Sequence, residues 1–119
     1  MPNQTNTLDL AKSLHDRIAR GELLEAFDDL YATEVVMQEN QNEPTVGHAL
    51  NREREVAFLE SIAEVHSYEV HAMAVHDDVS FVESTFRFRS TTGSEVAMTQ
   101  VARSRWVDGK IVEERFYHG

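Results

Sequence analysis

The feature that most constrains the fold is a two-residue turn near the C-terminal end of the chain. Asp108-Gly109 lies between two runs that are rich in β-branched and aromatic residues. Asp-Gly is a preferred pair for the type I′ turn of a two-residue hairpin, because both central residues of that turn need a positive φ. The turn therefore predicts that a strand from Glu95 to Val107 pairs antiparallel with the residues that follow Gly109.

The same turn predicts which residues of the hairpin share a face. An uninterrupted ladder places Trp106 opposite Ile111. It also places Arg115 opposite Ala102. A bulge near the terminus would exchange the faces of the residues that follow it. Without a bulge, one face carries Gln100, Ala102, Ser104, Trp106, Ile111, Glu113, Arg115 and Tyr117.

Upstream of the hairpin, the periodicity of the sequence changes from helical to stranded. Thr7 is the expected N-cap of a first helix that ends at Gly21, and a second short helix is expected over residues 22–32. A strand over 34–39 precedes a third helix, Ala49 to Glu64. Its apolar stripe is Ala49, Val56, Leu59 and Ala63. The strands Ser67 to His76 and Val79 to Ser90 then alternate with a period of two.

Length and composition exclude several classes of protein. A chain of 119 residues fits one domain, 1–119. Its net charge of −10 repels phosphate backbones, so nucleic acid is not an expected partner. Cysteine is absent, and no apolar run approaches the length of a membrane span. We therefore expect no disulfide, no membrane partner and a cytoplasmic location.

No motif indicates a metal or a cofactor. His66, His71 and His76 are five positions apart, so a regular strand places neighbouring members of the set on opposite faces. No glycine-rich motif for phosphates and no nucleophile elbow occurs. We therefore expect neither a metal site nor a cofactor.

Three stretches of the chain carry a resemblance to a known family. They are LYATEVVMQEN, GHALNREREVAFL and RSRWVDGKIVEERFYHG, and their order and separation extend the match over nearly the whole chain. The chain resembles the SnoaL-like family of the nuclear transport factor 2-like superfamily. The resemblance implies an α+β, cystatin-like fold, in which a curved antiparallel sheet wraps as an open cone around three helices.

The resemblance also implies a ligand pocket inside the cone and a homodimer through the outer surface of the sheet. It does not imply one chemistry, because a fold alone does not determine function. The apolar and aromatic side chains on the expected inner face suit a small hydrophobic molecule. We expect the ligand-binding residues to be Tyr31, Met98, Gln100, Trp106 and Tyr117.

Two residues occupy positions that carry chemistry in steroid-isomerase relatives. Glu39 ends the first strand, where those relatives place a carboxylate base. His15 matches a hydrogen-bond donor on their first helix. Either residue could instead be a solvated boundary residue.

One departure from the family pattern limits the chemistry that can be expected. Many catalytic relatives place an Asp or His where this chain has Ala102, whose methyl group cannot move a proton. Arg115, opposite Ala102 in the uninterrupted ladder, could supply an oxyanion partner instead. The sequence thus leaves three alternatives open: an isomerase, dehydratase or cyclase that uses Glu39, His15 and Arg115; a module that only binds a ligand; and a protein-interaction module.

Overall fold

The computed structural model describes residues 4–119, which form three helices and a six-stranded sheet. The elements in chain order are α1 (Gln4–Ala19), α2 (Leu23–Leu30), β1 (Tyr31–Glu39), β2 (Thr45–Val46), α3 (His48–Glu60), β3 (Ile62–His76), β4 (Val79–Ser90), β5 (Glu95–Val107) and β6 (Lys110–Tyr117). The helices precede the long strands, as the change of periodicity predicts.

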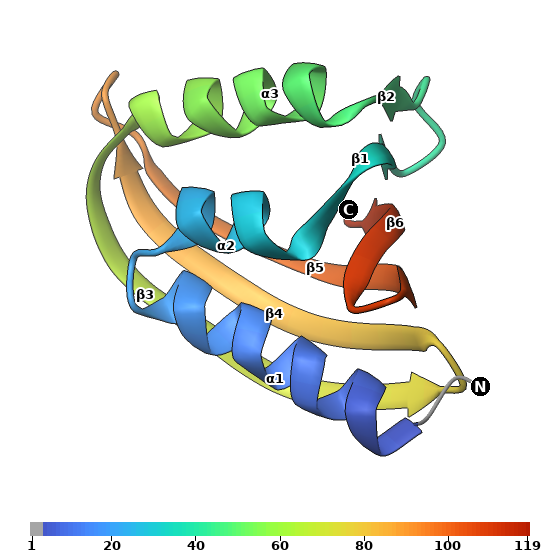
Figure 1. The fold of residues 1–119 in the computed structure, drawn as a ribbon. Helices are drawn as coiled ribbons and strands as arrows, with labels where there is room; N and C mark the ends of the chain where they lie inside the picture. The colour runs from blue at the N-terminus through green and yellow to red at the C-terminus, as the bar shows by residue number, and fades with distance from the viewer. Residues whose placement is uncertain (1–3) are drawn as a thin grey trace.

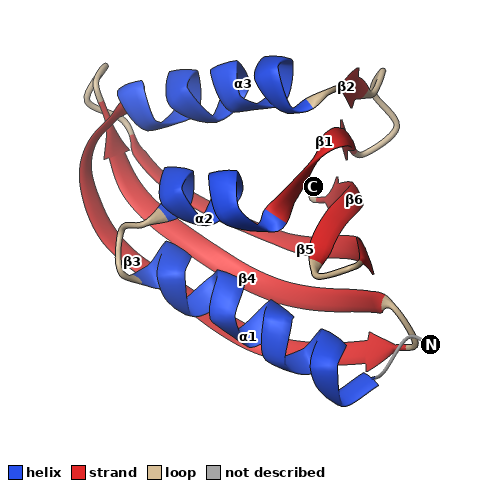
Figure 2. Cartoon of the chain, viewed as in Figure 1, coloured by secondary structure: helices blue, strands red, loops and turns tan. Residues whose placement is uncertain are grey.

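The sheet is curved and does not close, and the helices lie on its concave side (Figure 1). Its strand order is β2-β1-β6-β5-β4-β3. All neighbours are antiparallel except β1 and β6, which run parallel. The expected α+β cone is confirmed, although the sheet is mixed rather than wholly antiparallel. Figure 2 shows that helices cover one side of the red strands only.

The core lies where α1 and α2 meet β1 and the final hairpin. Its buried members are Leu14, Ala26, Phe27, Tyr31, Val35, Met37, Trp106 and Ile111. The indole N–H of Trp106 donates to the hydroxyl of Ser80 at 3.0 Å, so the buried tryptophan leaves no polar atom without a partner. Trp106 is therefore a core residue.

The register of the final hairpin differs from the predicted one. Asp108 and Gly109 both have positive φ, and Trp106 pairs with Ile111, as expected. Beyond this pair the ladder shifts by one residue, because Val112 has no partner in β5. The bulge lets Ile111 and Phe116, an odd number of positions apart, turn toward the same side.

The shift corrects two predicted placements. Ala102 pairs with Phe116, and Arg115 pairs with Arg103 on the other face of the sheet. Tyr117 follows Arg115 to that outer face, where the Arg115 guanidinium lies 5.0 Å from the Tyr117 ring centroid. Neither side chain faces the helices.

Helix boundaries also differ from the prediction: α2 ends at Leu30, two residues before the expected end of the second helix. Thr7 lies inside α1 rather than at its N-cap, and its hydroxyl donates to the carbonyl of Asp77 at 3.0 Å. Helix α3 ends at Glu60, so Ala63 belongs to β3. At the other end of α3, Ala49 is exposed while Asn51 is buried. Within the described residues, no helix is long and apolar enough to cross a membrane.

Candidate functional site

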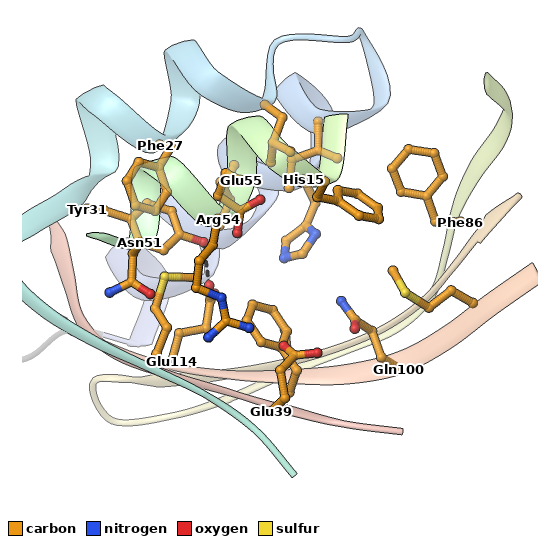
Figure 3. Close-up of a pocket in the computed structure, with 18 of the residues that line it drawn as sticks. His15, Phe27, Tyr31, Glu39, Asn51, Arg54, Glu55, Phe86, Gln100 and Glu114 are labelled. Carbon is orange, nitrogen blue, oxygen red and sulfur yellow. Dashed lines mark hydrogen bonds between the residues drawn. The ribbon is translucent and has the colours of Figure 1, made fainter. Parts of the chain in front are cut away.

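A cavity of about 210 Å³ lies between the helices and the concave face of the sheet. Most of its wall is apolar, with polar groups from α1, α3, β1, β3, β5 and β6. Figure 3 shows many of the side chains that point into it. The lining residues are Leu14, His15, Ile18, Leu23, Phe27, Tyr31, Met37, Gln38, Glu39, Asn51, Arg54, Glu55, Phe58, Tyr68, Phe86, Met98, Gln100, Ala102, Glu114 and Phe116.

Glu114 is a buried carboxyl group at the floor of the cavity, with 1% of the residue exposed. The hydroxyls of Tyr31 and Ser104 donate to its two oxygens, each at 2.5 Å (Figure 3 includes the Tyr31 bond). Burial raises the pKa of Glu114 to about 7, against the lowering effect of the two hydrogen bonds. The bulge at Val112 points this carboxyl group inward, since a regular strand would turn it to the outer face.

Glu55 presents a second carboxyl group to the cavity from α3. Desolvation raises its pKa to about 7, and the charges of Glu114 and Glu39 add to the shift, while Arg54 opposes it. Among the described residues, no side chain or backbone group makes a hydrogen bond or ion pair with the carboxyl group of Glu55. Glu55 is therefore a carboxyl group that is free to interact with a molecule in the cavity.

His15 and Tyr68 form a hydrogen-bonded pair on the wall between α1 and β3. The Tyr68 hydroxyl lies 2.6 Å from Nδ1 of His15. Burial lowers the pKa of His15 to about 4 and raises that of Tyr68 to about 12, so both groups are neutral at pH 7. When the imidazole carries its proton on Nε2, Tyr68 donates to Nδ1, and Nε2–H is available to another acceptor.

Glu39 lies at the mouth of the cavity. Its carboxylate pairs with the His118 imidazole at 3.1 Å, and its side chain is 34% exposed. The neighbouring Asn40 has a φ of 50° and fastens the end of β1 to the C-terminal segment. Its backbone oxygen accepts from Nε of Arg115 and its side-chain oxygen from the backbone N–H of His118, at 2.8 and 2.9 Å.

The structure brings five of the eight predicted site residues to the cavity: His15, Tyr31, Glu39, Met98 and Gln100. Trp106 lies in the core, and Arg115 and Tyr117 lie outside. Glu39 and His15 share the cavity without a hydrogen bond between them, since each has another partner. Their catalytic roles stay predictions.

Sequence reasoning missed Glu114, Glu55 and Tyr68. The helical spacing of Asn51, Glu55 and Phe58 places them on one face, and a polar pair beside an aromatic residue there could have indicated a site. For Glu114 the available signal was the spacing of two neighbouring apolar residues. Ile111 and Phe116 are an odd number of positions apart, so a regular strand would turn them to opposite faces, and burying both on one face requires a bulge. Within residues 4–119, no three His, Asp or Glu side chains are grouped to hold a metal ion.

Comparisons with known proteins agree with this architecture. Residues 11–114 match the SnoaL-like domain family. The chain is similar to a protein of Mesorhizobium loti assigned as a SnoaL-like polyketide cyclase, with 25% identity, a TM-score of 0.82, and 93% of this chain and 97% of that chain covered. Comparison with curated proteins gives no significant match.

Two further solved structures share the fold at lower identity. AclR of Streptomyces galilaeus, assigned as a hydroxylase, is 19% identical with a TM-score of 0.82, over 98% of this chain and 91% of that chain. An LEH-like epoxide hydrolase of M. tuberculosis is 13% identical with a TM-score of 0.79, over 99% and 86%. The family match covers most of the sequence, and the chain therefore belongs to the SnoaL-like domain family, within the nuclear transport factor 2-like superfamily.

Proposed function

We propose that this protein binds a small, largely apolar molecule in the cavity and transfers a proton to or from it through Glu55. The observation that carries this proposal is the Glu55 carboxyl group, which faces an apolar cavity without a partner in the described chain. A general acid or base works best when its pKa lies near the operating pH, and burial brings the pKa of Glu55 to about 7.

The His15–Tyr68 pair would provide the complementary donor. Both groups are neutral at pH 7. Depending on the tautomer of His15, either its Nε2–H or the Tyr68 hydroxyl can donate a hydrogen bond to a ligand oxygen. Removal of a proton from carbon by Glu55 would place negative charge on that oxygen. Isomerisation, dehydration and cyclisation all contain such a step.

This assignment revises the hypothesis from the sequence in two respects. Glu55 replaces Glu39 as the proposed base, because Glu39 is paired with His118 at the mouth of the cavity. His15 keeps its proposed role as donor. Arg115 lies on the outer face of the sheet, so it has no role in the proposed reaction.

The proteins with similar structures differ in their assigned activities, so they do not single out one reaction for this proposal. The activities assigned to these proteins include polyketide cyclase, hydroxylase and epoxide hydrolase. A second candidate function, ligand binding without chemistry, is favoured by Ala102, whose buried methyl group lines the cavity where many catalytic relatives carry an Asp or His. A direct measurement of proton transfer separates the two candidates.

The experiment is deuterium exchange at carbon. Small ketones, lactones and 1,3-diketones that raise the melting temperature would be incubated with the protein in D₂O and analysed by mass spectrometry. The expected result is a gain of deuterium next to the carbonyl group that Glu55→Gln slows by about 100-fold or more. Glu53→Gln, an exposed glutamate of the same helix, is the matched control. Equal rates in the native protein and Glu55→Gln would contradict the assignment, and binding without exchange would favour the non-catalytic module.

The homodimer and the cytoplasmic location expected from the sequence stay predictions. Sedimentation velocity tests the first, and a fluorescent fusion in cells tests the second. An entirely monomeric protein at micromolar concentration would contradict the expected dimer.

A further inference from the structure

The charged groups of the cavity are mostly acidic. Glu39, Glu55 and Glu114 contribute three carboxyl groups from three different elements. In the described chain, Arg54 is the only lysine or arginine in the wall. Arg54 is an exposed residue of α3, and its side chain lines the cavity (Figure 3). A hydrogen bond of 2.6 Å from its guanidinium to Oγ1 of Thr45 holds it there.

His15, the only histidine among the described residues of the wall, adds no positive charge. Burial keeps the pKa of His15 at about 4, so its imidazole is neutral at pH 7. A ligand anion in the cavity would therefore meet three carboxyl groups and, among the described residues, a single guanidinium, which donates one of its N–H groups to Thr45. Because like charges repel more strongly where water is excluded, a carboxylate or phosphate ligand is disfavoured.

An aromatic cluster stands beside the free carboxyl group. The rings of Phe58 and Phe86 meet edge to face with centroids 5.9 Å apart, and Tyr68 meets Phe86 in the same way at 5.6 Å. Phe58 follows Glu55 by one turn of α3, so the two side chains share a face of the helix. The faces of aromatic rings carry partial negative charge and attract cations.

We propose that the cavity selects a small apolar molecule that carries one positively charged group, a protonated amine. The ammonium N–H groups would donate to the Glu55 carboxylate, whose oxygens have no partner in the described chain, and its carbon neighbours would contact Phe58 and Phe86. This inference rests on the proposed function only in placing the ligand in this cavity. It does not require that a proton is transferred to carbon.

Binding of an amine also changes the ionisation of Glu55. A cation beside a carboxyl group stabilises its charged form, so a fraction of Glu55 that is protonated at pH 7 would release its proton to the buffer. The other charged groups around Glu55 are Glu114 of β6, Glu39 of β1 and Arg54 of α3, and all three remain in place when the ligand binds. Released protons are therefore a signature of an ammonium group beside the carboxyl groups of the cavity, and loss of the release in Glu55→Gln would assign it to Glu55.

The test uses three molecules that differ mainly in the group at one end: 2-phenylethylamine, 2-phenylethanol and phenylacetate. Isothermal titration calorimetry at pH 7 would compare their affinities for the native protein. The expected order is amine, then alcohol, then carboxylate, with the amine bound about tenfold or more tighter than the alcohol. Titration of the amine in phosphate and in Tris, which differ in ionisation enthalpy, would show protons released on binding.

Variants locate the effect within the cavity. Glu55→Gln is expected to remove most of the preference for the amine over the alcohol, about a tenfold change, and to abolish the proton release. Glu53→Gln, the exposed control on the same helix, is expected to leave both unchanged. Circular dichroism verifies that each variant is folded.

Four results would overturn the inference: an alcohol or carboxylate bound as tightly as the amine, no binding of any of the three, an unchanged preference in Glu55→Gln, or no release of protons when the amine binds the native protein. The two-buffer titration needs only the native protein and decides the matter even if a variant fails to fold. Deuterium exchange at carbon is measured separately, so failure of amine selection and failure of the proposed function give different results.

Discussion

Two adjacent glutamates of β6 differ completely in their surroundings. Glu113 lies on the outer face and pairs with Arg103 at 3.1 Å, with the two side chains 44% and 35% exposed. Glu114 lies on the inner face, where two hydroxyl groups replace water around its carboxyl group. The residue type is the same, so the curvature of the sheet and one bulged residue determine which of the two carboxyl groups is buried.

The largest expected effect follows from the pKa of Glu114. Its folded-state pKa of about 7 lies above the ordinary value of 4.5, so the protonated form favours folding. That stability is present below pH 4.5 and is lost as pH rises toward 7, which amounts to about 3 kcal/mol. Relative to Glu114→Gln, the native protein should therefore lose about 3 kcal/mol of unfolding free energy between pH 4.5 and pH 8, measured by urea denaturation.

The outer glutamate is the control for this comparison. Glu113→Gln makes the same chemical change one residue away, in a solvated ion pair. Its effect on the free energy of unfolding should vary by less than about 0.5 kcal/mol over the same pH range. A similar pH profile for both variants would refute the contrast between the two faces.

The second effect concerns the hydroxyl groups that surround Glu114. Tyr31→Phe removes one donor to a buried carboxyl group without changing the shape of the core, and should destabilise the protein by about 2 kcal/mol at pH 7. Because the Tyr31 hydrogen bond lowers the pKa of Glu114, its loss should raise that pKa further. A stability within about 0.5 kcal/mol of the native value would show that the bond contributes little.

The smallest effect is expected on the outer face. Arg103→Ala breaks the ion pair with Glu113, which water and salt already screen, and should cost less than about 1 kcal/mol. The loss should shrink further in 0.5 M sodium chloride. A loss above about 2 kcal/mol that is insensitive to salt would mean that the outer face is not simply solvated.

The elements of the fold were largely predictable because their signals are local. The Asp108-Gly109 turn predicts the last hairpin, and the change from helical to alternating periodicity predicts the order of helices and strands. The parallel pairing of β1 with β6 was not predicted. It joins segments that are distant in the sequence, and no local pattern encodes which strands become neighbours.

The site was less predictable than the fold. Glu39 and His15 were placed at the cavity by resemblance, whereas Glu114 depended on a bulge that a regular alternation conceals. Glu55 lies outside the apolar stripe expected for its helix, so no local pattern placed it in a cavity. A carboxyl group in an amphipathic helix does not reveal by itself whether it faces water outside or a cavity within.

The pairing of β1 with β6 has a consequence for the order of folding. The hydrogen bond from Tyr31 to Glu114 joins positions 83 residues apart in the sequence. Closing so long a loop costs chain entropy before the contacts between its ends can form. Pairings between strands that are distant in the sequence, such as β1 with β6, therefore form late. On a ribosome, the helices and the early strands would emerge first, and this floor of the cavity would be completed only after β6 had been synthesised.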